Sequence, residues 1–440
     1  MGLHRKTESR LQGVILALGT ALTCLAWSSW ALAQESSNQA ATGQQLTGAE
    51  ILRRSAEGGG LGGPQSVGAQ LEEDAAKRTT VSRRPAVDAL FQPFEDGLEA
   101  LKQLYGLQLG TDYQALYQHS NETLLGKEDG SSGSVRVFGK WQLVGRDSEA
   151  PGSLVFLFEQ RHELWNELTP QQLGEEIGYL GVTGTTFSDS GASLTTLYWE
   201  QRFANPNGGF AVGRIDPTDF IDILGYANQR TSFLNLSSLV NPTIALPDPG
   251  AGLVAATYLN NQLYVGGVIG DANGSLTEIE FFQNRSEFYK YGEIGWSPSP
   301  DQRYLTNIHG SAWQVDERTD AEIPESHGLV LSANVTLNEV LMPFVRAGWS
   351  DGEAPFYNRA VSGGLIYYFP RYRDLMGVSV AWNDPAIDDL REQYTLEAFY
   401  RYQVSDNIAV TADAQLLLSP SLHPTEDRIA VFGVRARANM

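Results

Sequence analysis

The chain of 440 residues is poor in cysteine, in histidine and in long apolar runs. Its single cysteine, Cys24, lies within a predicted secretory signal, so the exported chain would hold neither a disulfide nor a thiolate metal site. The six histidines are scattered, with no pair at metal-ligand spacing, and we expect neither a metal nor another cofactor. Beyond the signal, no apolar run reaches the roughly 20 residues that a membrane-spanning helix needs.

Positive charge is also scarce. Lysine and arginine number 31 against 52 aspartates and glutamates, and the formal net charge is −21. A nucleic-acid partner would require a cationic surface, so this balance argues against one. The sequence also lacks a nucleophile elbow, a HExxH pair and a nucleotide-binding loop, and we do not expect an enzyme.

The N-terminal part divides into two segments. Residues 1–33 combine a basic start, an apolar stretch and an A-x-A site, and they are predicted to be a secretory signal. Residues 34–106 are predicted to form a periplasmic extension that is helical or flexible, with short helices at 48–56, 70–77 and 93–105. The glycine-rich residues 58–64 predict a flexible break within it.

From Leu107 to Met440 the sequence pattern changes to short runs in which apolar and polar residues alternate. These runs are separated by Gly, Pro, Asn and Asp. Residues 394–403 are an example, because Tyr394 and Tyr400 share one face while Glu397 and Arg401 share the other. Such alternation predicts antiparallel strands, and a soluble sandwich would show it as well.

The residue types on the two faces of the predicted strands favour a membrane barrel. The polar face repeatedly carries full charges, and the apolar face ends in aromatic residues near the turns. Lipid outside and water inside would produce this arrangement. We therefore predict an all-β fold, a transmembrane antiparallel β-barrel of about 16 strands over residues 107–440. It would lie in the outer membrane of a Gram-negative-type bacterium, in contact with outer-membrane lipids, as a monomer or a homotrimer.

The same alternation predicts which charged side chains line the lumen. Opposite charges facing each other across a narrow, water-filled channel would orient a polar solute, and arginine can contact two hydroxyls at once. The predicted pore-lining or substrate-binding residues are Arg136, Lys140, Glu159, Arg161, Glu200, Arg202, Arg214, Asp216, Glu293, Arg346, Glu397, Arg401, Arg435 and Arg437. Many of them could instead simply brace the wall. Arg214 and Asp216 are singled out because they lie two apart at a strand end before Pro217.

Several stretches resemble the OprB family of carbohydrate-selective porins. They are FAVGRIDPTDF (residues 210–220), EQRH (159–162), GDAN (270–273), EIGW (293–296), FVRAGWSDG (344–352) and FGVRAR (432–437). The resemblance covers most of the chain from about residue 135 onward. It implies a single-chain barrel of about 16 strands, passive diffusion and a preference for sugars such as glucose.

Four functions remain open at this point. The main hypothesis is a porin for small carbohydrates, and the second is a general or anion-preferring porin on the same barrel. A secreted β-rich glycoside hydrolase, using two carboxylates, is a third. The fourth is an adhesin or structural barrel closed by its loops.

Overall fold

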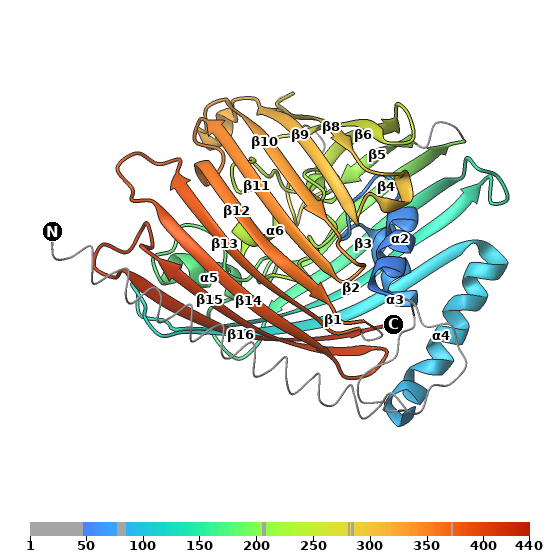
Figure 1. The fold of residues 1–440 in the computed structure, drawn as a ribbon, viewed down its shortest axis with the longest axis horizontal. Helices are drawn as coiled ribbons and strands as arrows, with labels where there is room; N and C mark the ends of the chain where they lie inside the picture. The colour runs from blue at the N-terminus through green and yellow to red at the C-terminus, as the bar shows by residue number, and fades with distance from the viewer. Residues whose placement is uncertain (1–46, 77–84, 205–207, 280–281, 283–285, 371–372) are drawn as a thin grey trace.

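The computed structural model describes residues 47–76, 85–204, 208–279, 282, 286–370 and 373–440. The predicted signal, residues 1–33, lies outside this range. Sixteen antiparallel strands form one closed barrel, in which each strand pairs with its neighbours in the chain and β1 pairs with β16. Figure 1 shows the strands tilted around the barrel. This confirms the predicted fold, and closure leaves no unpaired sheet edge in the membrane.

The strands are β1 (Leu107–Ser120), β2 (Asp129–Val144), β3 (Gly152–Glu163), β4 (Gly191–Phe203), β5 (Gly208–Ile215), β6 (Gly250–Tyr258), β7 (Leu263–Asp271), β8 (Phe288–Trp296), β9 (Thr306–Val315), β10 (Ser326–Val335), β11 (Leu341–Asp351), β12 (Tyr357–Tyr368), β13 (Leu375–Pro385), β14 (Gln393–Gln403), β15 (Ile408–Leu418) and β16 (Arg428–Asn439). The helices are α2 (Gly48–Gly59), α3 (Val67–Ala75), α4 (Pro85–Tyr105), α5 (Pro170–Glu176) and α6 (Leu236–Leu239), with 3₁₀ turns η2 (Pro217–Asp219), η3 (Pro300–Gln302) and η4 (Thr319–Ala321).

Burial alternates along the strands as the sequence pattern predicts. On β2, Val135 and Val137 are 40% and 45% exposed, whereas Arg136 between them is 2% exposed. On β14, Glu397 and Arg401 are buried while Tyr394 faces outward. Because strand side chains point alternately to the two faces of a sheet, the outer surface is apolar and the charges face the lumen.

The lumen is filled by chain from both ends of the barrel. The longest connections, among them residues 164–190 and 216–249, lie at one end of the barrel. Those at the end where β1 starts and β16 finishes are mostly shorter, which marks that end as the periplasmic one. The long connection 216–249, here called the lumen loop, follows β5 and is mostly buried. A hydrophobic cluster inside the barrel joins its Phe220 and Ile221 to wall residues such as Trp313.

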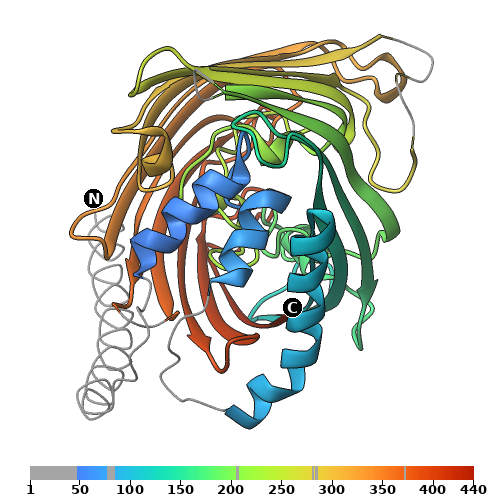
Figure 2. The same ribbon diagram turned by 90° about the vertical axis from the view of Figure 1, so that its right-hand side faces the viewer.

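Residues 47–76, here called the plug, enter the periplasmic mouth of the barrel, opposite the end from which the lumen loop enters. Helices α2 and α3 form a hairpin that lies across the opening in Figure 2, where both are blue. A capping box between Thr47 and Glu50 starts α2. Leu61 and Leu71 join the same interior cluster as the lumen loop.

The helices of the N-terminal extension are confirmed, but the plug is not a loosely attached segment. The flexible break predicted at residues 58–64 is a buried turn. Gly60 adopts a φ of +65°, a conformation that favours glycine. Gly68 packs so closely that a Cβ atom there would lie 2.2 Å from the carbonyl oxygen of Gly58. The composition predicted flexibility, yet here the glycines allow two helices to approach closely inside a narrow mouth.

Helix α4 connects the plug region to β1 and lies at the periplasmic rim of the barrel (Figures 1 and 2). Within the described part of the chain, no helix combines the length and the apolarity that crossing a membrane requires.

Candidate functional site: the barrel lumen

The lumen loop is tied to the wall by a buried ion pair. Arg346 on β11 places its Nε atom 2.9 Å from Oδ2 of Asp222 in the loop, and its guanidinium also donates to Tyr226 Oη at 2.6 Å. Asp222 further accepts hydrogen bonds from Ser332 at 2.5 Å and, at 3.0 Å, contacts His309. Burial would raise the pKa of Asp222, but Arg346 and His309 outweigh it and hold that pKa below its ordinary value.

Two more charges on the C-terminal strands hold the middle of the same loop. Glu397 accepts hydrogen bonds from the backbone N–H groups of Leu234 at 2.5 Å and of Asn235 at 3.1 Å. Arg435 donates to the carbonyl oxygens of Gln229 at 2.7 Å and Ser232 at 2.9 Å. These contacts satisfy backbone groups of an irregular segment that is shielded from water, so both side chains act as braces of the loop.

A second group of lumen charges holds the plug. Arg437 donates two hydrogen bonds to Asp74, at 2.9 and 2.8 Å, and pairs with Asp112 on β1 at 3.0 Å. Arg136 also pairs with Asp112 and donates to Gln70 of α3 at 2.7 Å. A guanidinium with two carboxylate partners is a strong, geometrically specific anchor.

The remaining plug contacts of the predicted residues are weaker. Lys140 lies 3.1 Å from Glu200 and donates to the Gly58 carbonyl at 3.4 Å. Arg202 reaches the Glu57 carbonyl at 3.4 Å, and Arg401 lies 3.6 Å from Glu73. The Lys140–Glu200 pair lies within the wall, and the contacts of 3.4 and 3.6 Å join the wall to α2 or to α3.

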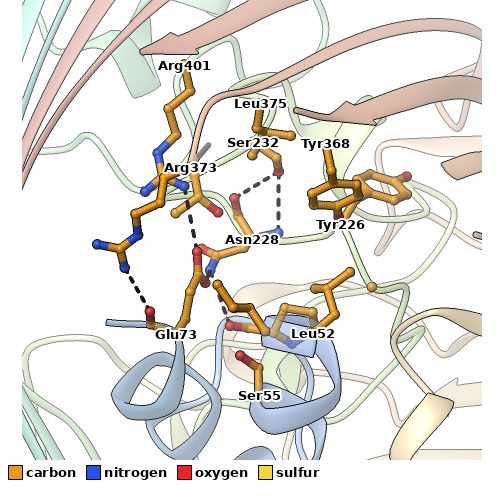
Figure 3. A pocket seen from close by; sticks show the side chains of 14 residues that line it. Leu52, Ser55, Glu73, Tyr226, Asn228, Ser232, Tyr368, Arg373, Leu375 and Arg401 are labelled. Carbon is orange, nitrogen blue, oxygen red and sulfur yellow. Dashed lines mark hydrogen bonds and ion pairs between the residues drawn. The ribbon is translucent and has the colours of Figure 1, made fainter. Parts of the chain in front are cut away.

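Plug, lumen loop and wall meet around Glu73 (Figure 3). Asn228 of the loop donates to Glu73 at 3.3 Å, and Arg373 donates to the Glu73 carbonyl at 3.0 Å. The pocket between them, bordered also by Leu52 and Tyr368, has a volume of about 50 Å³. Ligand pockets have volumes of about 300 to 1,000 Å³, so this junction is too small for an organic solute.

A larger cavity lies on the other side of the lumen loop and is here called the loop cavity. Its volume is about 360 Å³, and its lining includes Arg161, Asp216 and Asp248 together with Gln65 of the plug. Arg161 pairs with its neighbour Glu159 at 2.8 Å. Burial raises the pKa of both Asp216 and Asp248.

A further cavity of about 380 Å³ lies at the plug turn and is here called the plug cavity. Its lining includes Gly60 and Leu61 of the plug, Arg202 on β4 and Tyr264 on β7. The loop cavity is bordered by the next residues of the same turn, Gly63 and Pro64. The plug turn therefore separates two spaces within the barrel.

Arg214 and Asp216 have different surroundings, although the sequence suggested a shared role. Arg214 donates to the carbonyl oxygens of Leu194 at 2.6 Å, of Glu278 at 3.0 Å and of Ser275, and so braces neighbouring connections. Asp216 borders the loop cavity and accepts from Thr218 at the start of η2. Glu293, another predicted residue, accepts from Tyr264 at 2.8 Å and from Tyr291 at 2.5 Å.

Of the fourteen predicted residues, the structure therefore brings Arg161 and Asp216 to the loop cavity and Arg202 to the plug cavity. Others that the sequence did not single out share these spaces or the buried network, among them Gln65, Asp222, Gln229, Arg230, Asp248 and Arg373. All of them lie in irregular segments. Period-two alternation carries no information there, so no signal in the sequence could have assigned them to the lumen.

No group of three or more His, Cys, Asp or Glu side chains suited to a metal ion occurs in the described ranges.

Comparison with known proteins gives a consistent picture. Residues 290–440 match the family described as "Carbohydrate-selective porin, OprB family". Porin AaxA of Chlamydia muridarum is 24% identical over 259 residues, which cover 55% of this chain and 54% of that protein. Porin AaxA of Chlamydia trachomatis serovar L2 is 22% identical over 253 residues, 54% of this chain and 53% of that protein. The chain thus spans about half the length of the curated relatives it matches.

A solved structure of Pseudomonas putida OprB at high pH is similar in fold. It superposes with a TM-score of 0.61 at 14% identity, over 79% of this chain and 97% of that one. The resemblance to OprB porins is confirmed over residues 290–440, which contain the motifs at 293–296, 344–352 and 432–437, and the solved structure confirms the fold. The closed barrel with its apolar outer surface places the protein in the outer membrane, and residues 290–440 are similar to carbohydrate-selective porins.

Proposed function

We propose that this outer-membrane porin conducts small carbohydrates by passive diffusion. The observation that carries the proposal is the loop cavity, about 360 Å³ in volume, between the lumen loop and the wall. Ligand pockets fall in the range of about 300 to 1,000 Å³. A monosaccharide-sized solute is therefore a suitable occupant.

The lining of the loop cavity suits a neutral solute with many hydroxyls. Gln65, Gln171 and Gln229 offer amide donors and acceptors, and Arg161 and Asp216 offer charged ones. Phe356 and Leu246 supply apolar surface for a sugar ring. This combination of polar groups and an aromatic face is what a carbohydrate needs.

The charges around the loop cavity argue against a preference for anions. Its cation Arg161 is paired with Glu159 at 2.8 Å, and Asp216 and Asp248 add acidic groups to the lining. Since no excess positive charge faces the cavity, a small anion gains no electrostatic advantage there. The general porin remains as the second candidate, and the experiment below separates it from the first.

The plug limits the path toward the periplasm. Its turn separates the loop cavity from the plug cavity, and the junction in Figure 3 is too tight for a solute. A permeant that has reached the loop cavity must therefore pass the plug. We infer that displacement of the plug widens this passage and sets the rate of diffusion.

Swelling of liposomes that carry the purified, folded protein tests the proposal. Glucose is compared with an uncharged amino acid of similar size and with a larger oligosaccharide. Faster swelling in glucose than in the amino acid supports the carbohydrate porin. Equal rates for all small solutes would establish the general porin instead, and no swelling by a heat-modifiable, folded barrel would refute an open channel.

A further inference from the structure

Helix α4 presents an apolar face that nothing in the described chain covers. Leu90, Phe94 and Leu104 are 71%, 63% and 68% exposed. They recur at helical spacing along one side of the helix, and the space around Gly97 on the same side is open. So large an apolar stripe on a helix needs a partner, because exposing it to water is unfavourable.

The opposite, acidic side of α4 is the side that contacts the protein. Asp88 accepts a hydrogen bond from the backbone N–H of Asp406, and Glu95 accepts one from Asn407, both in the turn between β14 and β15. Glu99 and Lys102 border a space of about 290 Å³ whose other wall is α3 of the plug. The charged side therefore faces the plug and the rim of the barrel.

The apolar face accordingly points away from the lumen and its plug. The C-terminal end of α4 also meets the lipid-facing surface of the barrel directly. The Tyr105 carbonyl accepts a hydrogen bond from the indole of Trp141, an outward-facing residue near the end of β2, at 3.1 Å. Arg146 donates to the Leu104 carbonyl at 3.4 Å and to that of Tyr105. Trp141 and Leu143 belong to the outward-facing apolar surface, with 37% and 45% of each residue exposed, so the C-terminal end of α4 lies at the edge of that surface.

We propose that α4 is an interfacial helix, whose apolar face lies in the periplasmic leaflet of the outer membrane beside the barrel. An amphipathic helix of this kind buries its apolar side about 5–10 Å into the boundary between headgroups and acyl chains. The acidic residues of α4 do not oppose this, because they face the plug and leave the lipid-facing side uncharged.

A second copy of the chain fits this face less well than lipid does. A helix pair uses a narrow seam, flanked by complementary charges. Here the exposed Leu90, Phe94 and Leu104 are flanked on the barrel side by half-buried Phe91 and Leu98, and Leu98 borders the space toward the plug. In the described chain no pair of opposite charges borders the exposed face to select a partner helix.

Site-specific fluorescence tests the proposal on the full chain, in a background in which Cys24 is replaced by alanine. A polarity-sensitive dye is attached at Leu90→Cys or Phe94→Cys, with Asp96→Cys on the acidic side as the matched control. Each labelled protein is reconstituted into phosphatidylethanolamine–phosphatidylcholine vesicles, with and without brominated acyl chains. For labels at positions 90 and 94 we expect blue-shifted emission, and we expect brominated acyl chains to quench most of that fluorescence. The label at position 96 should show neither effect.

Equal quenching at positions 94 and 96 would overturn the proposal. So would a label at 94 that is shielded from water yet unaffected by bromines, since it would indicate a protein partner. A Leu90→Glu substitution in the Phe94→Cys chain serves as a second arm. It should restore a water-like emission while the heat-modifiable barrel remains folded, and unchanged quenching there would also count against the lipid contact.

Discussion

Arg346 and Asp222 lie 124 residues apart in the chain, and their side chains meet inside the barrel, Nε to Oδ2, at 2.9 Å. The first belongs to the wall and the second to the lumen loop. Each is almost completely buried, with side-chain exposures of 1% and 2%. A charge in such a position is costly unless it is paired, so the two groups depend on each other.

Replacing Arg346 with methionine should release the lumen loop. The substitution leaves Asp222 buried without its main counter-charge, and breaking such a pair typically costs about 3–5 kcal/mol. We expect faster proteolytic cleavage within residues 216–249, in a barrel that still shows heat-modifiable migration. Arg359→Met is the matched control, because the Arg359 side chain is 63% exposed and its partner Asp384 lies 3.9 Å away. Equal cleavage rates in the two variants would contradict the bracing role.

The same pair predicts how the loop responds to acid. The pKa of Asp222 is held below its ordinary value of 3.8. A carboxyl whose pKa is lower in the folded protein stabilises the fold at any pH above its ordinary pKa. This stabilisation is lost as the pH falls from the ordinary pKa to the lower pKa of the folded protein. Loop cleavage by an acid-tolerant protease should therefore stay constant down to about pH 4 and rise below it. In the Asp222→Asn variant the cleavage rate should depend little on pH. A transition of the wild-type protein near neutral pH would show that a group other than Asp222 controls the loop.

Tethering the plug should slow diffusion if the plug must move. A Cβ atom at Gly48 would lie 3.0 Å from Cβ of Tyr368 on the wall. Disulfides join Cβ atoms about 3.5–4.5 Å apart, so Gly48→Cys with Tyr368→Cys needs only a small adjustment. In the Cys24→Ala background, oxidation should slow glucose-driven liposome swelling severalfold, and a reductant should reverse the effect.

The control for the tether is a disulfide within the wall. Cβ atoms at Gly266 and Ala256, on neighbouring strands β7 and β6, would lie 3.2 Å apart. Oxidation of Ala256→Cys with Gly266→Cys should leave the swelling rate unchanged. If both oxidised proteins conduct glucose like the reduced ones, solutes pass the plug without displacing it.

Substituting Arg161 by glutamine should impair carbohydrate flux and change ion preference. The substitution removes the cation of the loop cavity and leaves Glu159, Asp216 and Asp248 without it. A hydrogen bond contributes about 1 kcal/mol, so we expect glucose-driven swelling to be roughly fivefold slower, and planar-bilayer conductance to shift toward cations. Arg359→Gln, outside the cavity, should change neither quantity. Unaltered flux and ion preference in Arg161→Gln would remove this residue from the permeation path.

The approximate number of strands, their antiparallel order and the facing of their side chains follow from the sequence alone. Along residues 394–403 the strict alternation of Tyr394 and Tyr400 with Glu397 and Arg401 was sufficient, because a strand has a side-chain period of two. The same local rule placed Arg136 and Arg435 inside the barrel. Each of these conclusions needs only neighbouring residues, and for that reason it could be reached without a structure.

The partners of those inward charges were decided by the tertiary structure. Arg136 meets Gln70 and Asp112, Arg435 meets backbone carbonyls of the lumen loop, and Arg346 meets Asp222. Residues 58–64 and 216–249 have no periodicity, so their sequence could not show that they fold into the lumen. Alternation tells whether a side chain faces water or lipid. Which charge it meets there depends on how the plug and the loop fill the space, and only the closed barrel defines that space.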